Sequence, residues 1–317
     1  MNAKKTTDAK AMAACIVCHI FWGFSFMASR KGLDAAPVFV LLSHRFLIAL
    51  AVMSLFAPGR VRFRSRQRRQ LFLLFCLGLA EPVVYFFGEQ YGLLHSNTIF
   101  SGVMIAMIPI FCTMLAIPLL GEKPGLGQVF FSLLSVAGVI GVGLTQKSSG
   151  SLDWIGVAAL LLAVLSAVAY TLISRRLSGE VPAFERTYVM MLEGALVFTA
   201  LALLSCRNDL TAYVRPFADR SYLLSVLFLS VGCSVLSYFL SGYAIGRLSV
   251  ARQTVFANLT TAVSIFAGTV FLHEPFTWLT LLFCLLILGG IFGVQAAGNR
   301  TEACHAQETS IHQQTGE

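Results

Sequence analysis

The feature that most constrains this chain is a series of long stretches that carry almost no charge. Seven stretches of about 20 residues contain no Asp, Glu, Lys or Arg, and three more have ionisable groups only near their middles. A helix needs about 20 apolar residues to cross a bilayer, whereas the strands of a membrane barrel alternate in polarity over about ten. The sequence therefore predicts an all-α integral membrane protein with ten transmembrane helices, over 11–29, 38–56, 71–88, 98–120, 125–146, 154–174, 187–206, 221–246, 253–272 and 275–299.

Composition agrees with a body surrounded by lipid. Only 12% of the 317 residues are charged and 57% are hydrophobic. A soluble domain has about 25% charged residues, so this chain has too few charges to cover a surface in water. Most classes of soluble enzyme are excluded on this ground.

Basic residues predict the orientation of the helices. Of the 23 Lys and Arg residues, 16 fall on the side of the N-terminus and six on the other side, with Arg45 inside a helix. Because cytoplasmic loops collect Lys and Arg, both termini are expected in the cytoplasm and the protein in the cytoplasmic membrane. The dense run from Arg60 to Arg69 is interpreted as a loop that fixes this topology, and no nucleic-acid partner is expected.

The chain repeats itself at a constant offset of 152 residues. Four rare-residue matches support this register: Tyr91 with Tyr243, Glu122 with Glu274, Gly138 with Gly290, and Gly141 with Gly293. Five helices are thus duplicated, and because five is odd, the second copy enters the membrane from the opposite side. Such inverted repeats favour two conformations of similar energy, which is the basis of alternating access in transporters. The predicted parts are an N-terminus at 1–10, repeats at 11–146 and 154–297, and a disordered cytoplasmic tail at 298–317.

Several short motifs, in this order and on these helices, resemble the EamA family of the drug/metabolite transporter superfamily. They are Phe21-Trp22-Gly23, His44-Arg45-Phe46, Ile108-Pro109-Ile110-Phe111, Leu119-Leu120-Gly121-Glu122, Ser237-Tyr238 with Tyr243, Ala137-Gly138-Val139 and Gly289-Gly290. The resemblance implies a ten-helix carrier with a central cavity that moves a small metabolite. Glu81-Pro82 and Thr260-Thr261 depart from the family pattern, so the resemblance does not identify the substrate.

Three charged residues fall near the membrane midplane. Arg45, Glu81 and Glu193 each cost at least about 2.5 kcal/mol there unless a partner or water is present, and His19 and His44 are their titratable neighbours. One alternative is an inert ion pair of Arg45 with Glu81 or Glu193. A single arginine cannot neutralise both carboxylates, so we expect a proton-coupling group among Glu81, Glu193 and His19, with Glu81 preferred because Pro82 breaks the helix beside it.

Aromatic residues complete the predicted substrate site. Trp22, Tyr85 and Tyr238 lie deep in their helices and are expected to line the cavity with Arg45, Glu81 and Glu193. Aromatic rings around a carboxylate favour a cationic or amphipathic substrate such as an amine, a drug-like compound or a hydrophobic amino acid. Packing of the rings against lipid is the other interpretation. An anionic or nucleotide-linked substrate bound by Arg45 is the alternative within transport, and export is the expected direction.

Other functions find less support in the sequence. Cys15 and Cys18 form a CxxC, but neither a second cysteine pair nor a histidine is taken to complete a metal set. The spacing is interpreted as helix packing, without a metal or cofactor. The six histidines show no catalytic spacing, so an enzyme is not expected. A receptor or scaffold would leave the midplane charges unexplained. The expected partners are a small-molecule substrate and the lipid bilayer, with a homodimer left open.

Overall fold

The computed structural model describes residues 2–61, 66–108, 110–111, 126–148, 153–177, 179–245 and 250–315, and its elements in this part of the chain are all helical. The first half contains α1 (Asn2–Ala35), α2 (Val38–Ser54), α3 (Arg68–Gly78), a π-helical segment (Leu79–Val84), α4 (Tyr85–Leu94), α5 (Thr98–Ile105) and α7 (Leu126–Ser148). The second half contains α8 (Trp154–Leu177), α9 (Ala183–Ser205), α10 (Thr211–Val214), a 3₁₀ turn (Arg215–Ala218), α11 (Arg220–Leu227), a π-helical segment (Phe228–Leu236), α12 (Ser237–Ile245), α13 (Val250–Phe271) and α14 (Trp278–Thr315).

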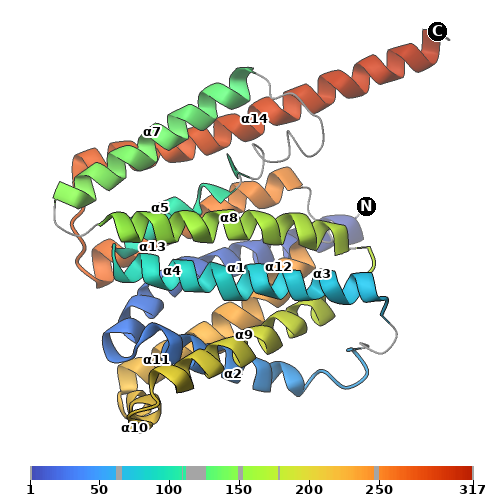
Figure 1. Ribbon diagram of the computed structural model, residues 1–317. Helices are drawn as coiled ribbons and strands as arrows, with labels where there is room; N and C mark the ends of the chain where they lie inside the picture. The colour runs from blue at the N-terminus through green and yellow to red at the C-terminus, as the bar shows by residue number, and fades with distance from the viewer. Residues whose placement is uncertain are drawn as a thin grey trace.

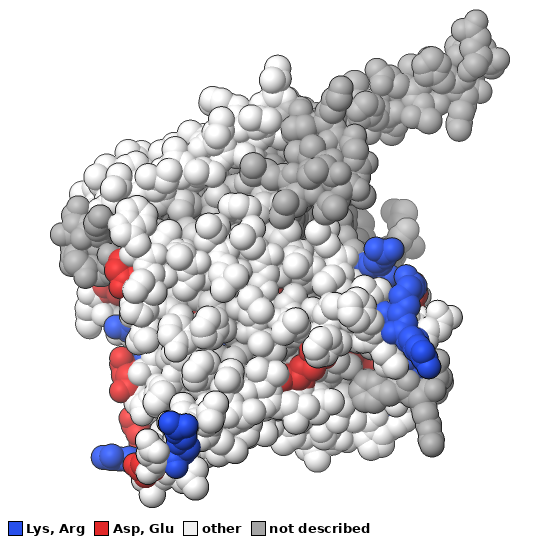
Figure 2. All heavy atoms as spheres, in the orientation of Figure 1, with Lys and Arg blue, Asp and Glu red and all other residues white. Residues whose placement is uncertain are grey.

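The long helices run side by side (Figure 1). Figure 2 shows the charged groups of this face mostly at its two ends, with a nearly uncharged surface between them. Six helices in the described residues are long and apolar enough to cross a membrane: Ala9–Ala35, Arg68–Leu94, Leu126–Thr145, Trp154–Ser174, Ala183–Ser205 and Arg220–Ser241. The protein is therefore a multi-pass, all-helical membrane protein.

The structure does not confirm the predicted number of ten crossings. Three further apolar helices are shorter, over Val38–Ser54, Leu259–Phe271 and Trp278–Val294. The segment expected at 98–120 is described only as far as residue 111, where α5 forms its first part. Pro109 and the Leu119–Glu122 motif lie outside the described residues. The division into 1–10, 11–146, 154–297 and 298–317 stays a prediction, although the helical backbone of α14 continues to Thr315.

Helices α7 and α14 make the repeat visible as a reciprocal contact. They pack against each other at one edge of the bundle, as Figure 1 shows at the top. A Cβ placed on Gly138 would lie 3.0 Å from the carbonyl oxygen of Phe283, and one on Gly290 would lie 2.8 Å from that of Phe131. The two glycines are 152 residues apart, and so are the two phenylalanines. The two glycines thus allow close approach at symmetry-equivalent points, as small residues do between membrane helices.

The remaining helices pair mainly between the two halves of the chain. α2 packs on α9, α1 on α13 and α12, and α4 on α8. Buried apolar side chains of α2, α4, α8 and α9 form the largest core cluster, which includes Phe46, Phe86 and Phe198. Because α1, α2, α4, α5, α8, α12 and α13 surround one central space, residues of both halves line the same cavity.

Candidate functional site

A cavity of about 290 Å³ lies between the two halves of the chain. The structure brings six of the seven predicted site residues to its wall, and they come from five different elements. These six are His19, Trp22, Arg45, Glu81, Tyr85 and Tyr238. These six residues therefore lie together although their positions in the sequence range from 19 to 238.

Glu81 reaches the cavity because the helix is interrupted at this residue. Its backbone is extended, with φ −138° and ψ 115°, inside the π-helical segment between α3 and α4. Pro82 disfavours a helical conformation in the residue before it. The neighbouring carbonyl oxygen of Ala80 accepts a hydrogen bond from the Ser166 hydroxyl at 2.7 Å, so the break leaves this group satisfied within the membrane. The Glu81 carboxylate accepts a short hydrogen bond from the Tyr238 hydroxyl.

Arg45 is buried but forms no ion pair within the described part of the chain. Its Nε donates to the Ser234 hydroxyl at 2.9 Å, and its Cζ lies 4.2 Å from the centre of the Phe86 ring. The inert pair with Glu81 or Glu193 that the sequence left open is not formed. Ring and hydroxyl hold the guanidinium at the cavity wall, with its charge available to a ligand.

Glu89 is a second cavity carboxylate, and the sequence analysis missed it. It accepts hydrogen bonds from Tyr85 at 3.2 Å and from the Gln90 amide at 2.9 Å. Gln90 also donates to the Ser29 hydroxyl at 3.1 Å, which ties α4 to α1. Glu89 follows the apolar run 71–88 directly and so lies just outside the helix predicted there. Its place two turns after Glu81 was the signal that both carboxylates share a face.

Aromatic side chains form much of the rest of the wall. Trp22 donates from Nε1 to the Cys233 carbonyl at 3.3 Å, and its ring meets the ring of Tyr238 edge-on at 5.8 Å. Tyr85 and Phe86 line the same cavity and stand edge-on to each other at 4.8 Å. Tyr170 of α8 is a further lining residue. The cavity thus combines rigid apolar faces with a few charged groups, as ligand sites commonly do.

Glu193 and His44 lie apart from the cavity. The Glu193 carboxylate covers Gly78 of α3, where an added Cβ would clash with its Oε2. His44 is hydrogen-bonded through Nδ1 to the Tyr222 hydroxyl at 2.7 Å and packs against Phe217 at a ring distance of 4.3 Å. The structure therefore separates Glu193 from the other predicted site residues, and its predicted role has no cavity contact to support it.

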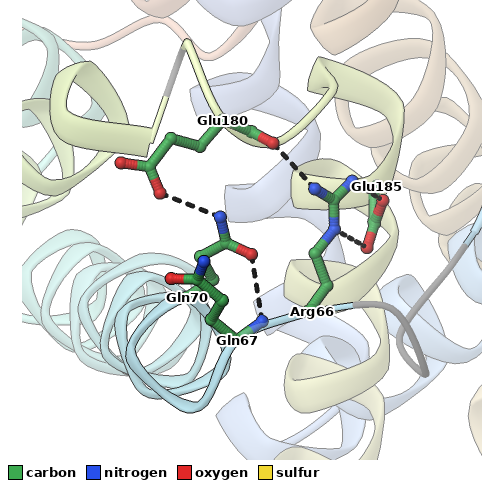
Figure 3. A network of polar contacts seen from close by, with 5 residues as sticks. All are labelled: Arg66, Gln67, Gln70, Glu180 and Glu185. Carbon is green, nitrogen blue, oxygen red and sulfur yellow. Dashed lines mark hydrogen bonds and ion pairs between the residues drawn. The ribbon is translucent and has the colours of Figure 1, made fainter.

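A second polar group, the Arg66 cluster, joins the two halves at the end of the bundle where α3 begins. It consists of Arg66, Gln67, Arg69, Gln70, Glu180 and Glu185, five of which are drawn in Figure 3. Arg66 donates to both oxygens of Glu185, at 3.1 and 2.8 Å, and to the carbonyl of Glu180 at 2.7 Å. Hydrogen bonds from Gln70 and Arg69 hold the pKa of the Glu180 carboxyl below its ordinary value of 4.5.

A third contact between the halves lies at the opposite end, where α5 begins. Glu274 accepts hydrogen bonds from the backbone N–H groups of Thr98 at 2.7 Å and Ile99 at 2.9 Å. The first N–H groups of a helix have no partner within it, and a carboxylate there is also favoured by the helix dipole. His273 precedes Glu274 with a positive φ of 54°. The repeat places Gly121 at the equivalent position, which is the residue best suited to that backbone conformation.

Two helical repeats around a charged, aromatic cavity in an apolar bundle are typical of membrane transporters. The sequence profile of the EamA-like transporter family matches residues 9–144 and again 154–295. The chain belongs to this family and is a membrane transporter. The resemblance inferred from the motifs is confirmed, including its two copies.

Individual relatives agree with the family. An uncharacterized transporter of Bacillus subtilis, YcxC, is 31% identical over 295 residues, which cover 91% of this chain and 94% of the relative. A probable terminal-alkyne amino-acid exporter of Streptantibioticus cattleyicolor is 27% identical over 295 residues, with 92% and 95% covered. A crystal structure 19% identical in sequence has a TM-score of 0.65 and covers 93% of this chain and 99% of its own. That likeness supports the fold alone.

Proposed function

We propose that this transporter exports an amino acid with an apolar side chain across the cytoplasmic membrane by alternating access. The observation that carries the proposal is the pattern of charge in the cavity. Arg45 lies on its wall without an ion pair to any described residue, and so do the carboxylates of Glu81 and Glu89. A zwitterion offers a carboxylate to the arginine and an ammonium group to a glutamate, so it matches both signs at once.

The apolar and aromatic surface favours a hydrophobic side chain on this amino acid. Trp22, Tyr85 and Phe86 provide flat apolar faces beside the charges. A volume of about 290 Å³ lies at the lower end of the roughly 300–1,000 Å³ of small-molecule sites. The name of the Streptantibioticus relative, a probable amino-acid exporter, points to the same class of substrate and the same direction.

Proton exchange is the proposed coupling. Arg45 cannot balance both Glu81 and Glu89, so one of the carboxylates carries a proton when no ligand is bound. An arriving ammonium group replaces that proton, and the proton leaves on the side from which the substrate came. Glu81 is the proposed carrier, because its only described hydrogen bond is the one from Tyr238. The charge distribution of the loops supports cytoplasmic termini for this export carrier.

The alternative substrate is an anionic or nucleotide-linked metabolite. Arg45 would bind its acidic group, and the two glutamates would have to be protonated or compensated by a cation. This substrate would engage one of the three cavity charges, whereas the zwitterion engages Arg45 and one of the two glutamates. A free amine would conversely make no contact of opposite charge with Arg45.

Flux into proteoliposomes tests the proposal. Radiolabelled leucine, a primary amine and a sugar phosphate are compared under an imposed pH gradient, in the wild type and in the Glu81→Gln and Glu193→Gln variants. We expect saturable, gradient-dependent leucine flux that Glu81→Gln abolishes. Glu193→Gln is the matched control, since it changes a carboxylate outside the cavity, and it should retain flux. Flux of the sugar phosphate alone would overturn the proposal in favour of the anion carrier.

A further inference from the structure

Three potential metal ligands stand together on α1, beside the central cavity. One ligand atom each of Cys15, Cys18 and His19 lies within 4.8 Å of the others. Both cysteines are buried, and His19 is half-buried and lines the cavity. Residues at positions i, i+3 and i+4 share one face of a helix. The CxxC interpreted above as packing therefore has a third ligand, one helical turn from its first cysteine.

The imidazole of His19 is positioned by Thr260 of α13. The Thr260 hydroxyl donates to the backbone carbonyl of His19 at 3.3 Å, and the same oxygen is 3.0 Å from Nδ1. Since its single hydrogen is used on the carbonyl, the hydroxyl accepts from Nδ1–H. In the neutral imidazole, a hydrogen on Nδ1 leaves the lone pair of Nε2 for a metal. A hydrogen bond from the other ring nitrogen is the usual support of a metal-binding histidine.

The ligands select the type of ion. Two soft cysteine sulfurs together with one imidazole suit Zn²⁺ and related divalent ions such as Cd²⁺. Binding of M²⁺ converts the two thiols to thiolates, forms two metal–sulfur bonds and one metal–nitrogen bond, and releases two protons. The product is electrically neutral, which is what the membrane interior tolerates. Tetrahedral bonds of about 2.3 Å place two sulfurs roughly 3.8 Å apart, so small side-chain rotations close the site.

We propose that Cys15, Cys18 and His19 bind a divalent thiophilic ion, and that the ion slows transport. The ion enters from the cavity, because His19 belongs to both the cavity wall and the site. Through Thr260, the same histidine connects α1 of the first half to α13 of the second. A bound ion would fix the contact between His19 and Thr260. Alternating access requires the two halves to move against each other, and this contact has to change when they do. The transport part rests on the function proposed above, and the binding part does not.

Titration of the purified full-length protein with Cd²⁺ tests the binding directly. Ultraviolet absorption from thiolate-to-metal charge transfer should rise to saturation at one ion per chain, with release of two protons into a weakly buffered solution. Cys15→Ser and Cys18→Ser should each weaken binding at least tenfold, and His19→Gln should weaken it similarly. Cys76→Ser is the matched control, since that half-buried cysteine of α3 is outside the site. Cys15→Ala repeats the test should the serine variant fail to fold.

The result that would overturn the site is equal charge-transfer absorption in the wild type and the Cys15 and Cys18 variants, or none in the wild type. Transport is measured separately, with Cd²⁺ inside the proteoliposomes and outside. The wild type and Cys76→Ser should lose at least tenfold in flux, and Cys18→Ser should keep its own flux in the presence of the ion. If the ion binds but wild-type flux does not change, the metal site stands and its proposed inhibition of transport is wrong. Absence of flux for every substrate would contradict the proposed function and not the absorption result.

Discussion

The Arg66 cluster and the central cavity both combine arginine with glutamate, but they treat the charges differently. Arg66 and Glu185 face each other with two hydrogen bonds, and Arg69 and Glu180 meet at 2.5 Å. In the cavity, Arg45 is bonded to a hydroxyl and an aromatic ring, while Glu81 and Glu89 are bonded to tyrosines and an amide. The paired charges of the cluster hold the halves together, whereas the cavity charges have no ion-pair partner in the described part of the chain and can bind a ligand. The two regions should therefore respond to mutation in opposite ways.

The largest expected effect is on stability, at Arg66. Its side chain is 15% exposed and that of Glu185 is fully buried, so Arg66→Gln leaves a buried carboxylate without a cation. Breaking a buried pair costs about 3–5 kcal/mol, and the lower end applies because Arg66 is at the rim. Thermal unfolding in detergent measures the loss. Glu185→Gln should cost less, because Arg66 can turn toward water, and equal losses in the two variants would contradict this account.

Arg45→Gln should instead weaken substrate binding and leave the stability of the protein nearly unchanged. The change removes a charged hydrogen bond to the substrate, worth about 1.5–3 kcal/mol, or roughly 10- to 150-fold in apparent affinity. No ion pair among the described residues is broken, so the unfolding temperature should stay close to that of the wild type. Ligand-binding measurements and thermal unfolding on the same preparation separate the two effects. Unfolding as large as that of Arg66→Gln would mean that Arg45 belongs to the fold and not to the site.

Glu274, which is hydrogen-bonded to the first backbone N–H groups of α5, should give an effect of intermediate size on stability. Glu274→Gln weakens the cap of α5 by about 1 kcal/mol, since one uncharged oxygen replaces a carboxylate at two backbone N–H groups. Because this cap joins the second half to the first, the variant should open α5 more often. Hydrogen–deuterium exchange of the amides at Thr98 and Ile99 should become faster, while exchange in α9 stays unchanged. Uniform acceleration throughout the protein would indicate global destabilisation instead.

The smallest effect concerns pH and the exposed part of the Arg66 cluster. The pKa of Glu180 is held below 4.5 in the folded protein, by Gln70 first and Arg69 second. Its contribution to stability is present above the pKa of the unfolded chain and is lost as the pH falls through the folded pKa. Wild type and Glu180→Gln should therefore differ above pH 4.5 and converge below it. Unfolding temperatures between pH 3 and 7 measure this, and a constant difference would contradict the assignment.

Much of the architecture follows from the sequence, because lipid imposes simple rules on it. Uncharged stretches give the helices, and the offset of 152 residues gives the reciprocal glycines of α7 and α14. The number of crossings does not follow as directly. Segment 71–88 is broken at Glu81, and α11 passes through a π-helical segment before α12, so apolar length is not the length of one regular helix.

The site was predictable where residue type alone is unusual in a membrane. Arg45 and Glu81 stood out for this reason, and the structure brings them to one cavity. Glu89 was missed because it follows a helix boundary drawn at residue 88. Glu193 looked equivalent to Glu81 in depth, but helix rotation directs it toward Gly78. Depth can be counted along a sequence, whereas the face of a helix that meets the cavity depends on packing between the halves.

Recognition of both ends of a zwitterion is the central claim, and binding of paired ligand analogues tests it most directly. Leucine, its decarboxylated amine and its N-acetyl derivative are titrated against the wild type, Arg45→Gln and Glu81→Gln. We expect Arg45→Gln to weaken the binding of leucine and N-acetyl-leucine but not of the amine. Glu81→Gln should weaken the binding of leucine and the amine but not of N-acetyl-leucine. If both variants weaken the binding of all three ligands equally, Arg45 and Glu81 do not each bind one end of the substrate, and the claim is wrong.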